Sequence, residues 1–336
     1  MPRQFRVERP DTSTDTLPHV ESKLEKSFGE QDLGTFTTRR DAADGVSLEE
    51  TEDEVYLVRD DGSEWGGLLK DVVNKGSQVE LIVDGFERYA RNAPPTDGDN
   101  IYENVDDSTP ISDAVSDTPA LSAGTISTVD SGVSFVFSHS SQAKKMRRVE
   151  ASAAGELRFN PDKTVDYVAS LGSDKTATVL SPSNQNVIGD MEVTRKGGNS
   201  RVTHLRMLGA GEGPAQVSTE VSITGAPTDP ADQIWDTYRD KGLTSEDALQ
   251  NLGDTIIAEM NQEHLEVEAA IRGLDVVLGD EFRVTKPEED VDSDLRVVEV
   301  TEILDKAGLR YSVVLSNRQK SRGSEESKRR QDVENY

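Results

Sequence analysis

Short segments with strictly alternating apolar residues constrain the fold of this chain more than any other feature. In residues 77–86, SQVELIVDGF, the side chains of Val79, Leu81 and Val83 fall on one face and the residues between them on the other. A period of two is typical of a β-strand with one buried face. We therefore expect this segment to be a strand.

Similar segments recur along the chain and are joined by short turns. The segments 54–69 (EVYLVRDDGSEWGGLL) and 155–168 (GELRFNPDKTVDYV) each read as two strands about a turn, as does 190–211 with its Gly-Gly-Asn centre. Further strands are predicted at GVSFVFSH, VSTEVSIT, HLEVEAAI, DEFRVT, LRVVEVTEIL and LRYSVVLSN, and DVVLGDEFRV at 275–284 reads as strand, Gly-Asp turn and strand. These patterns predict a mainly β, antiparallel chain.

Two helices interrupt the strands. Residues 140–155, SSQAKKMRRVEASAAG, read as a short basic helix that ends at Gly155. Residues 244–262 form the clearest helical pattern, with Thr244 or Ser245 as the cap. Apolar residues then recur at steps of three and four, namely Leu249, Leu252, Ile256 and Met260.

Other segments predict little regular structure. Residues 1–30 are mostly polar with few apolar anchors, and the Pro- and Asp-rich residues 92–113 read as a linker or long loop. The last 18 residues are charged and are expected to form a frayed tail.

The charge balance is strongly acidic. The chain has 37 basic and 64 acidic residues, a formal net charge of −27 and no cysteine. Two interpretations are compatible: adaptation to molar salt, which screens self-repulsion, and a surface that repels nucleic acid. Nucleic-acid binding through a basic patch is not expected, and disulfides and thiolate chemistry are excluded.

The sequence contains no targeting or spanning signal. The N-terminal residues MPRQFRVERPDTST have no apolar stretch typical of a secretory signal, and no run approaches the roughly 18 apolar residues of a transmembrane helix. We expect the chain to be made in the cytoplasm and not to insert into a membrane.

Two motifs resemble catalytic or phosphate-binding elements only weakly. GAGEG at 209–213 lacks the spacing of a phosphate loop, and Pro214 and a strand follow it where a helix is required. Ser141 and Lys144 match S-x-x-K, but the partner motifs S-D-N and K-T-G do not occur, so a capping serine ahead of solvent-facing basic residues is the favoured interpretation.

The remaining candidates favour structural roles. The acidic residues 288–294, with Asp290, Asp292 and Asp294, begin like a calcium loop but lack its glycine and bidentate glutamate. A solvated acidic loop is therefore favoured over weak cation binding, and the same interpretation applies to Asp97 and Asp99. His19, His139, His204 and His264 are scattered without zinc-site spacing, and Trp65 and Trp235 favour core or interface anchoring. We therefore assign no catalytic, cofactor-binding or metal-binding residue and expect no cofactor.

Three segments taken in order resemble a known family. They are EWGGLLKDVVNKGSQVELIVDGFERYARN, MRRVEASAAGELRFNPDKTVDYVASLGSDKT, and the stretch from Thr244 through LGDEFRV to LRVVEVTEILDKAGLRYSVVLSNR. Together they resemble the first barrel, the middle and the closing barrel of baseplate hub proteins from the tail tips of tailed viruses. The match covers most of residues 55–320, whereas residues 96–130 match nothing in the family. Combined with the acidic composition, it implies a virus of a salt-loving archaeon.

The resemblance implies an architecture and a role. Four ranges follow from it: a tube-like β-barrel at 1–95, an α+β middle domain at 96–185, a second tube-like barrel with the 244–262 helix at 186–318, and a charged tail at 319–336. For this chain the resemblance implies a non-enzymatic homotrimer, whose six barrels adapt a hexameric tail tube to threefold tip components around the DNA channel.

The implied partners are the tail tube or distal tail protein, the tape measure protein, tail-tip or fibre proteins, and genomic DNA that passes without specific binding. The implied location is the virion tail tip, after assembly in the host cytoplasm. A tail-associated hydrolase that acts on the host envelope, and a neighbouring distal tail ring protein, are the alternatives. In this architecture Asp280 would serve a turn, with Gly279 supplying backbone freedom.

Overall fold

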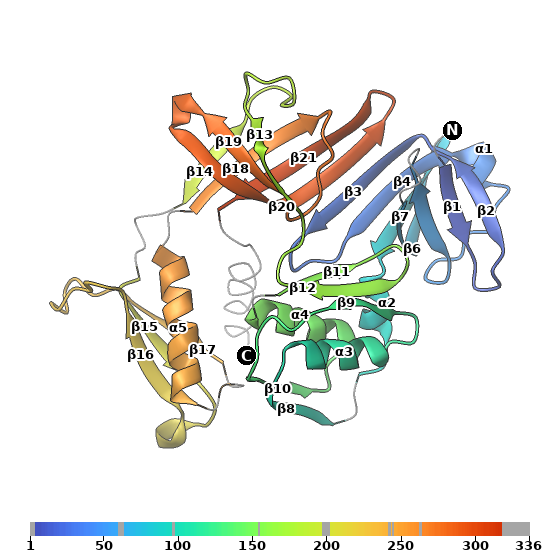
Figure 1. The fold of residues 1–336 in the computed structure, drawn as a ribbon. Helices are drawn as coiled ribbons and strands as arrows, with labels where there is room; N and C mark the ends of the chain where they lie inside the picture. Colours follow the sequence, from blue (N-terminus) through green and yellow to red (C-terminus); the bar gives the residue numbers. More distant parts are fainter. Residues whose placement is uncertain are drawn as a thin grey trace.

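The computed structural model describes residues 4–59, 64–95, 98–153, 155–196, 202–240, 243, 245–261 and 264–317. Its chain is mainly β, as predicted (Figure 1). Four units can be distinguished by their strands and cores: a first β-unit, a middle unit, a second β-unit and a small lobe inserted into the second β-unit.

The first β-unit is a curled antiparallel sheet with the strand order β3-β4-β7-β6-β5-β1-β2. Its elements are β1 (Gln4–Glu8), β2 (Thr14–Pro18), β3 (Glu21–Ser27), β4 (Leu33–Arg39), α1 (Arg40–Ala43), β5 (Glu54–Val58), β6 (Glu64–Lys75) and β7 (Gln78–Gly85). The predicted strands at 54–69 and 77–86 are confirmed. Residues 4–27, predicted to have few apolar anchors, instead supply three strands, because Phe5, Val7, Leu17 and Leu24 are buried in the core.

The second β-unit is built from strands that lie far apart in the sequence. Its elements are β13 (Asp174–Leu180), β14 (Glu192–Lys196), β18 (His264–Arg272), β19 (Glu281–Lys286), η2 (Pro287–Glu289), β20 (Val291–Asp305) and β21 (Gly308–Ser316). The predicted hairpin between β20 and β21 is confirmed. In residues 275–284, however, only the second half is a strand.

The two β-units join through a pair of strands, β3 and β20. One edge of β20 pairs with β21; its other edge pairs first with β19, over 291–296, and then with β3, over 299–304. Because β19 and β3 share that edge, the strands of the two β-units form one thirteen-stranded sheet. No closed barrel is detected among the described strands, so the two tube-like barrels stay a prediction. The β13–β19 pair is also parallel, an exception to the antiparallel prediction.

The middle unit combines helices with two small sheets. Its elements are α2 (Glu87–Asn92), β8 (Asp99–Val105), α3 (Ser108–Ser116), β9 (Ser122–Ile126), β10 (Val133–Ser138), α4 (Gln142–Ser152), β11 (Glu156–Phe159) and β12 (Thr164–Val168). The predicted helix at 140–155 and hairpin at 155–168 are confirmed as α4 and β11–β12. Residues 92–113, predicted as a linker, instead contain β8 and part of α3, because Ile111 and its neighbours on α3 are buried against α4.

The inserted lobe has its own sheet and core. Its elements are β15 (His204–Leu208), η1 (Gly213–Ala215), β16 (Ser218–Ser222), β17 (Trp235–Arg239) and α5 (Glu246–Asn261). Helix α5, which the sequence predicted, packs on β15 and β16 and not on the large sheet.

The predicted hairpin at 190–211 is wrong. Strand β14 pairs with β18, whereas β15 belongs to the lobe; the predicted turn, Gly197–Asn199, lies outside the described residues. The four predicted domain ranges stay predictions, and the predicted tail at 319–336 also lies outside the described part. No helix among the described residues is long and apolar enough to cross a membrane.

Candidate functional site

Among the described residues, buried ion pairs join the units to one another. We call the first the Arg147 junction; it consists of Arg147, Glu87, Glu150 and the backbone carbonyl of Glu30. Arg147 and Glu150 lie one turn apart on α4, Glu87 begins α2, and Glu30 lies between β3 and β4. The junction therefore ties the middle unit to the first β-unit.

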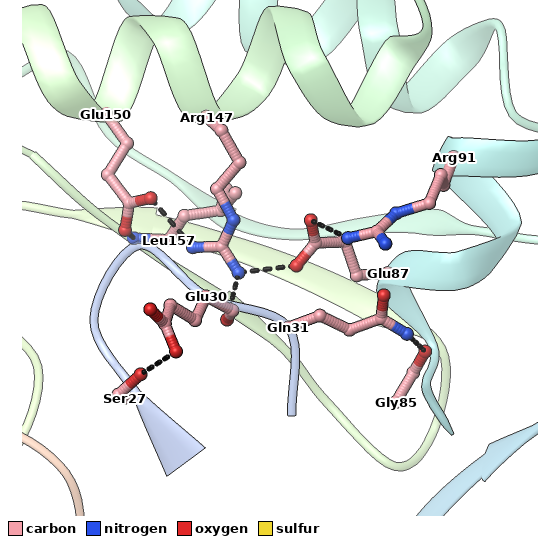
Figure 2. A network of polar contacts seen from close by, with 9 residues as sticks. All are labelled: Ser27, Glu30, Gln31, Gly85, Glu87, Arg91, Arg147, Glu150 and Leu157. Carbon is pink, nitrogen blue, oxygen red and sulfur yellow. Dashed lines mark hydrogen bonds and ion pairs between the residues drawn. The ribbon is translucent and has the colours of Figure 1, made fainter. Parts of the chain in front are cut away.

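The guanidinium of Arg147 contacts all three partners (Figure 2). Its Nη1 lies 2.7 Å from Glu150 Oε2, and its Nη2 lies 2.5 Å from Glu87 Oε2 and 2.8 Å from the Glu30 carbonyl oxygen. The other oxygen of Glu150 accepts the Leu157 N–H at 3.0 Å. The two carboxylates thus hold one cation and one strand end in fixed positions.

Burial governs the electrostatics of this junction. Only 5% of the Glu87 side chain and 2% of the Glu150 side chain are exposed. Burial raises the pKa of Glu150, which Arg147 and the Leu157 N–H only partly offset. Burial also opposes the charge of Arg147, but the two carboxylates outweigh it, so the pKa of Arg147 is raised above its ordinary value.

A cavity of about 200 Å³ lies beside the junction. Its lining includes Asp32, Trp65, Arg147, Arg158 and Phe159, and burial raises the pKa of Asp32. The lining contains carboxyl, ammonium and guanidinium groups together with a serine and an asparagine, but no histidine. Across the described residues no group of three metal-ligating side chains occurs.

A second junction ties the middle unit to the second β-unit. Arg296 on β20 forms a two-pronged ion pair with Glu156 on β11, and its Nη2 also donates to the Leu171 carbonyl at 2.8 Å. Glu156 in turn accepts the Leu171 N–H at 2.6 Å. The guanidinium carbon lies 4.9 Å from the centre of the Phe28 ring. This arrangement fixes three separate chain segments around one cation.

The Gly279–Asp280 turn of DVVLGDEFRV belongs to the same region. The Asp280 carboxylate is fully buried and accepts the Ser173 and Val277 N–H groups and the Lys175 ammonium at 2.8–2.9 Å. Gly279 has φ of +90°, a conformation that favours glycine. Asp280 therefore holds a turn together.

Two further pairs connect distant segments. Arg59, which follows β5, forms two hydrogen bonds of 2.9 and 2.8 Å with Glu302 on β20 and so links the two β-units directly. Lys163, in the β11–β12 turn, lies 2.8 Å from Glu54 on β5. The hydroxyls of Tyr56 and Tyr89 also donate to Glu54. These contacts thus join the two β-units to each other and the middle unit to the first β-unit.

The predicted catalytic candidates take structural positions. The Ser141 hydroxyl accepts the Lys144 N–H as the N-cap of α4, and the Lys144 side chain is exposed. The basic residues of this helix do not all face solvent, because Lys145 is only 1% exposed. The 209–213 glycine segment follows β15 and leads into the short η1 and then β16, not into a long helix.

The acidic candidates and the histidines are dispersed, and Asp292 and Asp99 lie on strands β20 and β8 and not in loops as predicted. Asp292 pairs with Arg283 at 2.9 Å, and the Ser138 hydroxyl donates to Asp99, whereas Asp97 lies outside the described residues. The imidazole of His19 lies within hydrogen-bond distance of a serine, His204 stacks on a tryptophan, and His139 has φ of +47°; the side chain of His264 is not described. Trp65 is buried in the first β-unit, and Trp235 is 47% exposed.

Comparison with known proteins finds similar folds among solved structures. No protein-family model and no curated protein matches the chain. The tail protein from Neisseria meningitidis MC58 is 12% identical with a TM-score of 0.66, and the match covers 94% of this chain and 97% of that one. The 43 kDa tail protein of prophage MuSo2 from Shewanella oneidensis is 8% identical with a TM-score of 0.68, over 95% and 99% of the two chains.

A third relative supports the same assignment of fold. The prophage tail protein gp18 from Listeria monocytogenes EGD-e is 11% identical with a TM-score of 0.65, and the match covers 94% of this chain and 95% of that one. At identities this low, the similarity concerns the fold. The chain therefore has the fold of these tail proteins over nearly its whole length.

Proposed function

We propose that this chain is a non-enzymatic structural subunit of a viral tail tip. The observation that carries the proposal is the shared fold, which extends over 94–95% of the chain in three tail proteins. The most specific polar groups of the described residues, Arg147, Arg296 and Asp280, hold segments together, which is the role expected in a load-transmitting subunit.

Three copies form a ring in this proposal. Each chain contributes two β-units, and the β3–β20 pairing fixes them side by side within one sheet. Six β-units around a threefold axis would match a hexameric tail tube on one side and threefold tip components on the other. The proposed partners are the tube or distal tail protein, the tape measure protein and tail-tip or fibre proteins.

The acidic charge suits both the environment and the channel of such a ring. Carboxylates on the channel wall would repel DNA phosphates, so that the genome passes without binding. A net charge of −27 is also best tolerated where salt screens it, which favours a virus of a salt-loving archaeal host. The proposed location is the tail tip of the virion, after assembly in the host cytoplasm.

Electron microscopy of the purified chain in multimolar KCl tests the ring. The expected result is a threefold ring with six similar β-lobes around an open centre. Sixfold rings with one chain per lobe would instead favour a neighbouring distal tail protein. Single particles at every protein concentration would contradict the proposed ring.

A further inference from the structure

The inserted lobe leaves one face of its sheet uncovered. Helix α5 packs on the inner face, where Leu205, Met207 and Val221 contact Leu249 and Ile257. The outer face is formed by alternate residues of the three strands, which lie side by side in the register of the sheet. They are Ser218, Glu220 and Ser222 on β16, His204, Arg206 and Leu208 on β15, and Trp235, Thr237 and Arg239 on β17.

An ordered aromatic pair marks one corner of this face. The imidazole of His204 stacks on the indole of Trp235, with ring centres 4.6 Å apart and an angle of 24° between the planes. The indole N–H of Trp235 donates to Gln233 Oε1 at 3.0 Å. Trp235 is nevertheless 47% exposed, and so is the neighbouring Ile234. A large aromatic side chain is therefore held in one orientation while much of it faces solvent.

The lobe's own fold does not account for this exposure. The core on the inner face is complete without Trp235, and β17 is an edge strand that pairs only with β15 among the described strands. Exposed tryptophan and arginine side chains are the groups most enriched at the energetic centres of protein interfaces. An edge strand has backbone N–H and C=O groups free to pair with another chain, and apolar residues at its start favour such a contact.

The charge of the outer face is opposite to that of the whole chain. The face carries two arginines, Arg206 and Arg239, and one carboxylate, Glu220, which lies 3.8 Å from Arg206 in an exposed ion pair. The chain as a whole has 64 acidic and 37 basic residues. The face is thus complementary in charge to most of the surface of another copy of the same chain.

The lobe is a separate part of the molecule. It is inserted between β14 and β18 and stands apart from the first β-unit (Figure 1). A contact to the middle unit is the ion pair between Arg148 and Asp240, 3.6 Å long.

We propose that the outer face of the inserted lobe, centred on Trp235 and flanked by Arg206 and Arg239, docks onto an acidic surface of a second copy of this chain. The inference rests on the proposed ring and names one of its subunit contacts. Trp235 supplies the apolar anchor, and the two arginines select an acidic neighbour. A contact between a basic face and a different, acidic surface is heterologous, which is the type that closes a ring.

Sedimentation velocity of the full chain tests the contact at low and at molar KCl. Trp235→Ser should raise the dissociation constant of self-association about 30-fold, as loss of an interface anchor does. The double variant Arg206→Glu and Arg239→Glu should raise it about tenfold at low salt and less at molar salt, because salt screens the charge pairs. Ile101→Ser, which removes a 60% exposed apolar side chain from β8, is the matched control and should change nothing.

Fluorescence gives a second readout that does not depend on a disruptive variant. The chain has two tryptophans, so the difference spectrum between the wild type and Trp235→Phe reports Trp235. This spectrum should shift to shorter wavelength as the protein associates, because the indole loses water.

The outcomes separate this inference from the proposed ring. Variants that associate like the wild type, with a Trp235 spectrum that stays water-exposed, would overturn the contact and leave the ring intact. Variants that associate more weakly than the wild type, when the wild-type assembly contains a number of copies other than three at every concentration, would support the contact and contradict the threefold ring. A wild type that stays monomeric at every concentration and salt would overturn both.

Discussion

Removal of Arg147 should destabilise the protein strongly, because the substitution leaves two buried carboxylates without their shared cation. The structure sets the magnitude. Arg147→Met keeps most of the aliphatic volume but removes contacts of 2.5 and 2.7 Å to side chains that are only 5% and 2% exposed. Breaking a buried ion pair by deleting one partner costs about 3–5 kcal/mol. Glu87 retains Arg91 at 3.8 Å, and Glu150 retains the Leu157 N–H, so we expect about 3 kcal/mol.

The unfolding free energy lost in Arg147→Met should become smaller as pH falls. Burial already raises the pKa of Glu150 in the folded protein, and loss of Arg147 removes the positive charge that partly offsets burial. A carboxyl whose pKa is higher in the folded than in the unfolded state destabilises the fold when it is ionised, and this penalty disappears as pH falls through the folded pKa. The difference in unfolding free energy between wild type and variant should therefore narrow from neutral pH toward a pH of about 4.

Urea unfolding in molar KCl, followed by circular dichroism, measures the effect. The matched control is Arg158→Met. The side chain of Arg158 is 53% exposed and lies 2.7 Å from Asp166, so its removal should cost less than about 1 kcal/mol. Arg147→Met combined with Glu150→Gln should recover part of the loss. A cost for Arg147→Met no larger than that of Arg158→Met, or a cost that does not narrow at acid pH, would refute this account of the junction.

Further predictions concern the turn, the link between β-units, the helix cap and salt. Gly279→Ala should cost about 3 kcal/mol, because its φ is +90° and the new Cβ would clash with the Leu171 carbonyl oxygen; Gly29→Ala, with φ of +75° and open space around it, should cost only about 1 kcal/mol in the same unfolding assay. A double-mutant cycle of Arg59→Met and Glu302→Gln should give a coupling of about 1–3 kcal/mol, and additive losses would contradict a direct link. Ser141→Ala should lower the unfolding free energy by about 1 kcal/mol through the lost cap of α4, whereas an unchanged midpoint would argue against capping. The thermal midpoint should rise from dilute buffer to molar KCl, and a fall would contradict the screening interpretation of the −27 charge.

Local hairpins could be predicted because each strand's partner follows it in the sequence. The alternation in 155–168 and in 295–317 specifies both strands and the turn between them, and both pairings are confirmed. The β3–β20 pairing could not be predicted, since its paired residues, such as Ser27 and Glu299, are more than 270 positions apart in the sequence and no local pattern encodes a shared edge. For the same reason the thirteen-stranded sheet that joins the two β-units could not be predicted.

Other wrong predictions concern a strand with few apolar residues and two strands that are adjacent in sequence but belong to different sheets. Strand β2 contains Leu17 as its buried residue, so its TDTLP sequence resembles a polar loop. Strands β14 and β15 are near neighbours in sequence, but the chain leaves the large sheet between them to build the lobe. Sequence proximity therefore suggested a hairpin that tertiary packing does not form.

The junction residues lacked a sequence signal. Arg147 lies in a basic helix and was expected to face solvent, but its partners come from segments more than 50 residues away, such as Glu87 and Glu30. The i, i+3 spacing of Arg147 and Glu150 was the only local hint of a pair. Burial of a charged side chain depends on which distant elements cover it, so the burial of Arg147 could not be predicted from the local sequence.

The most direct test of the proposed function is the symmetry and position of this chain in an assembled tail. A cryo-electron microscopy map of virions that carry the chain should place three copies at the tail tip, with six β-units around the channel. A single copy per virion, or copies placed away from the tip, would contradict the proposal.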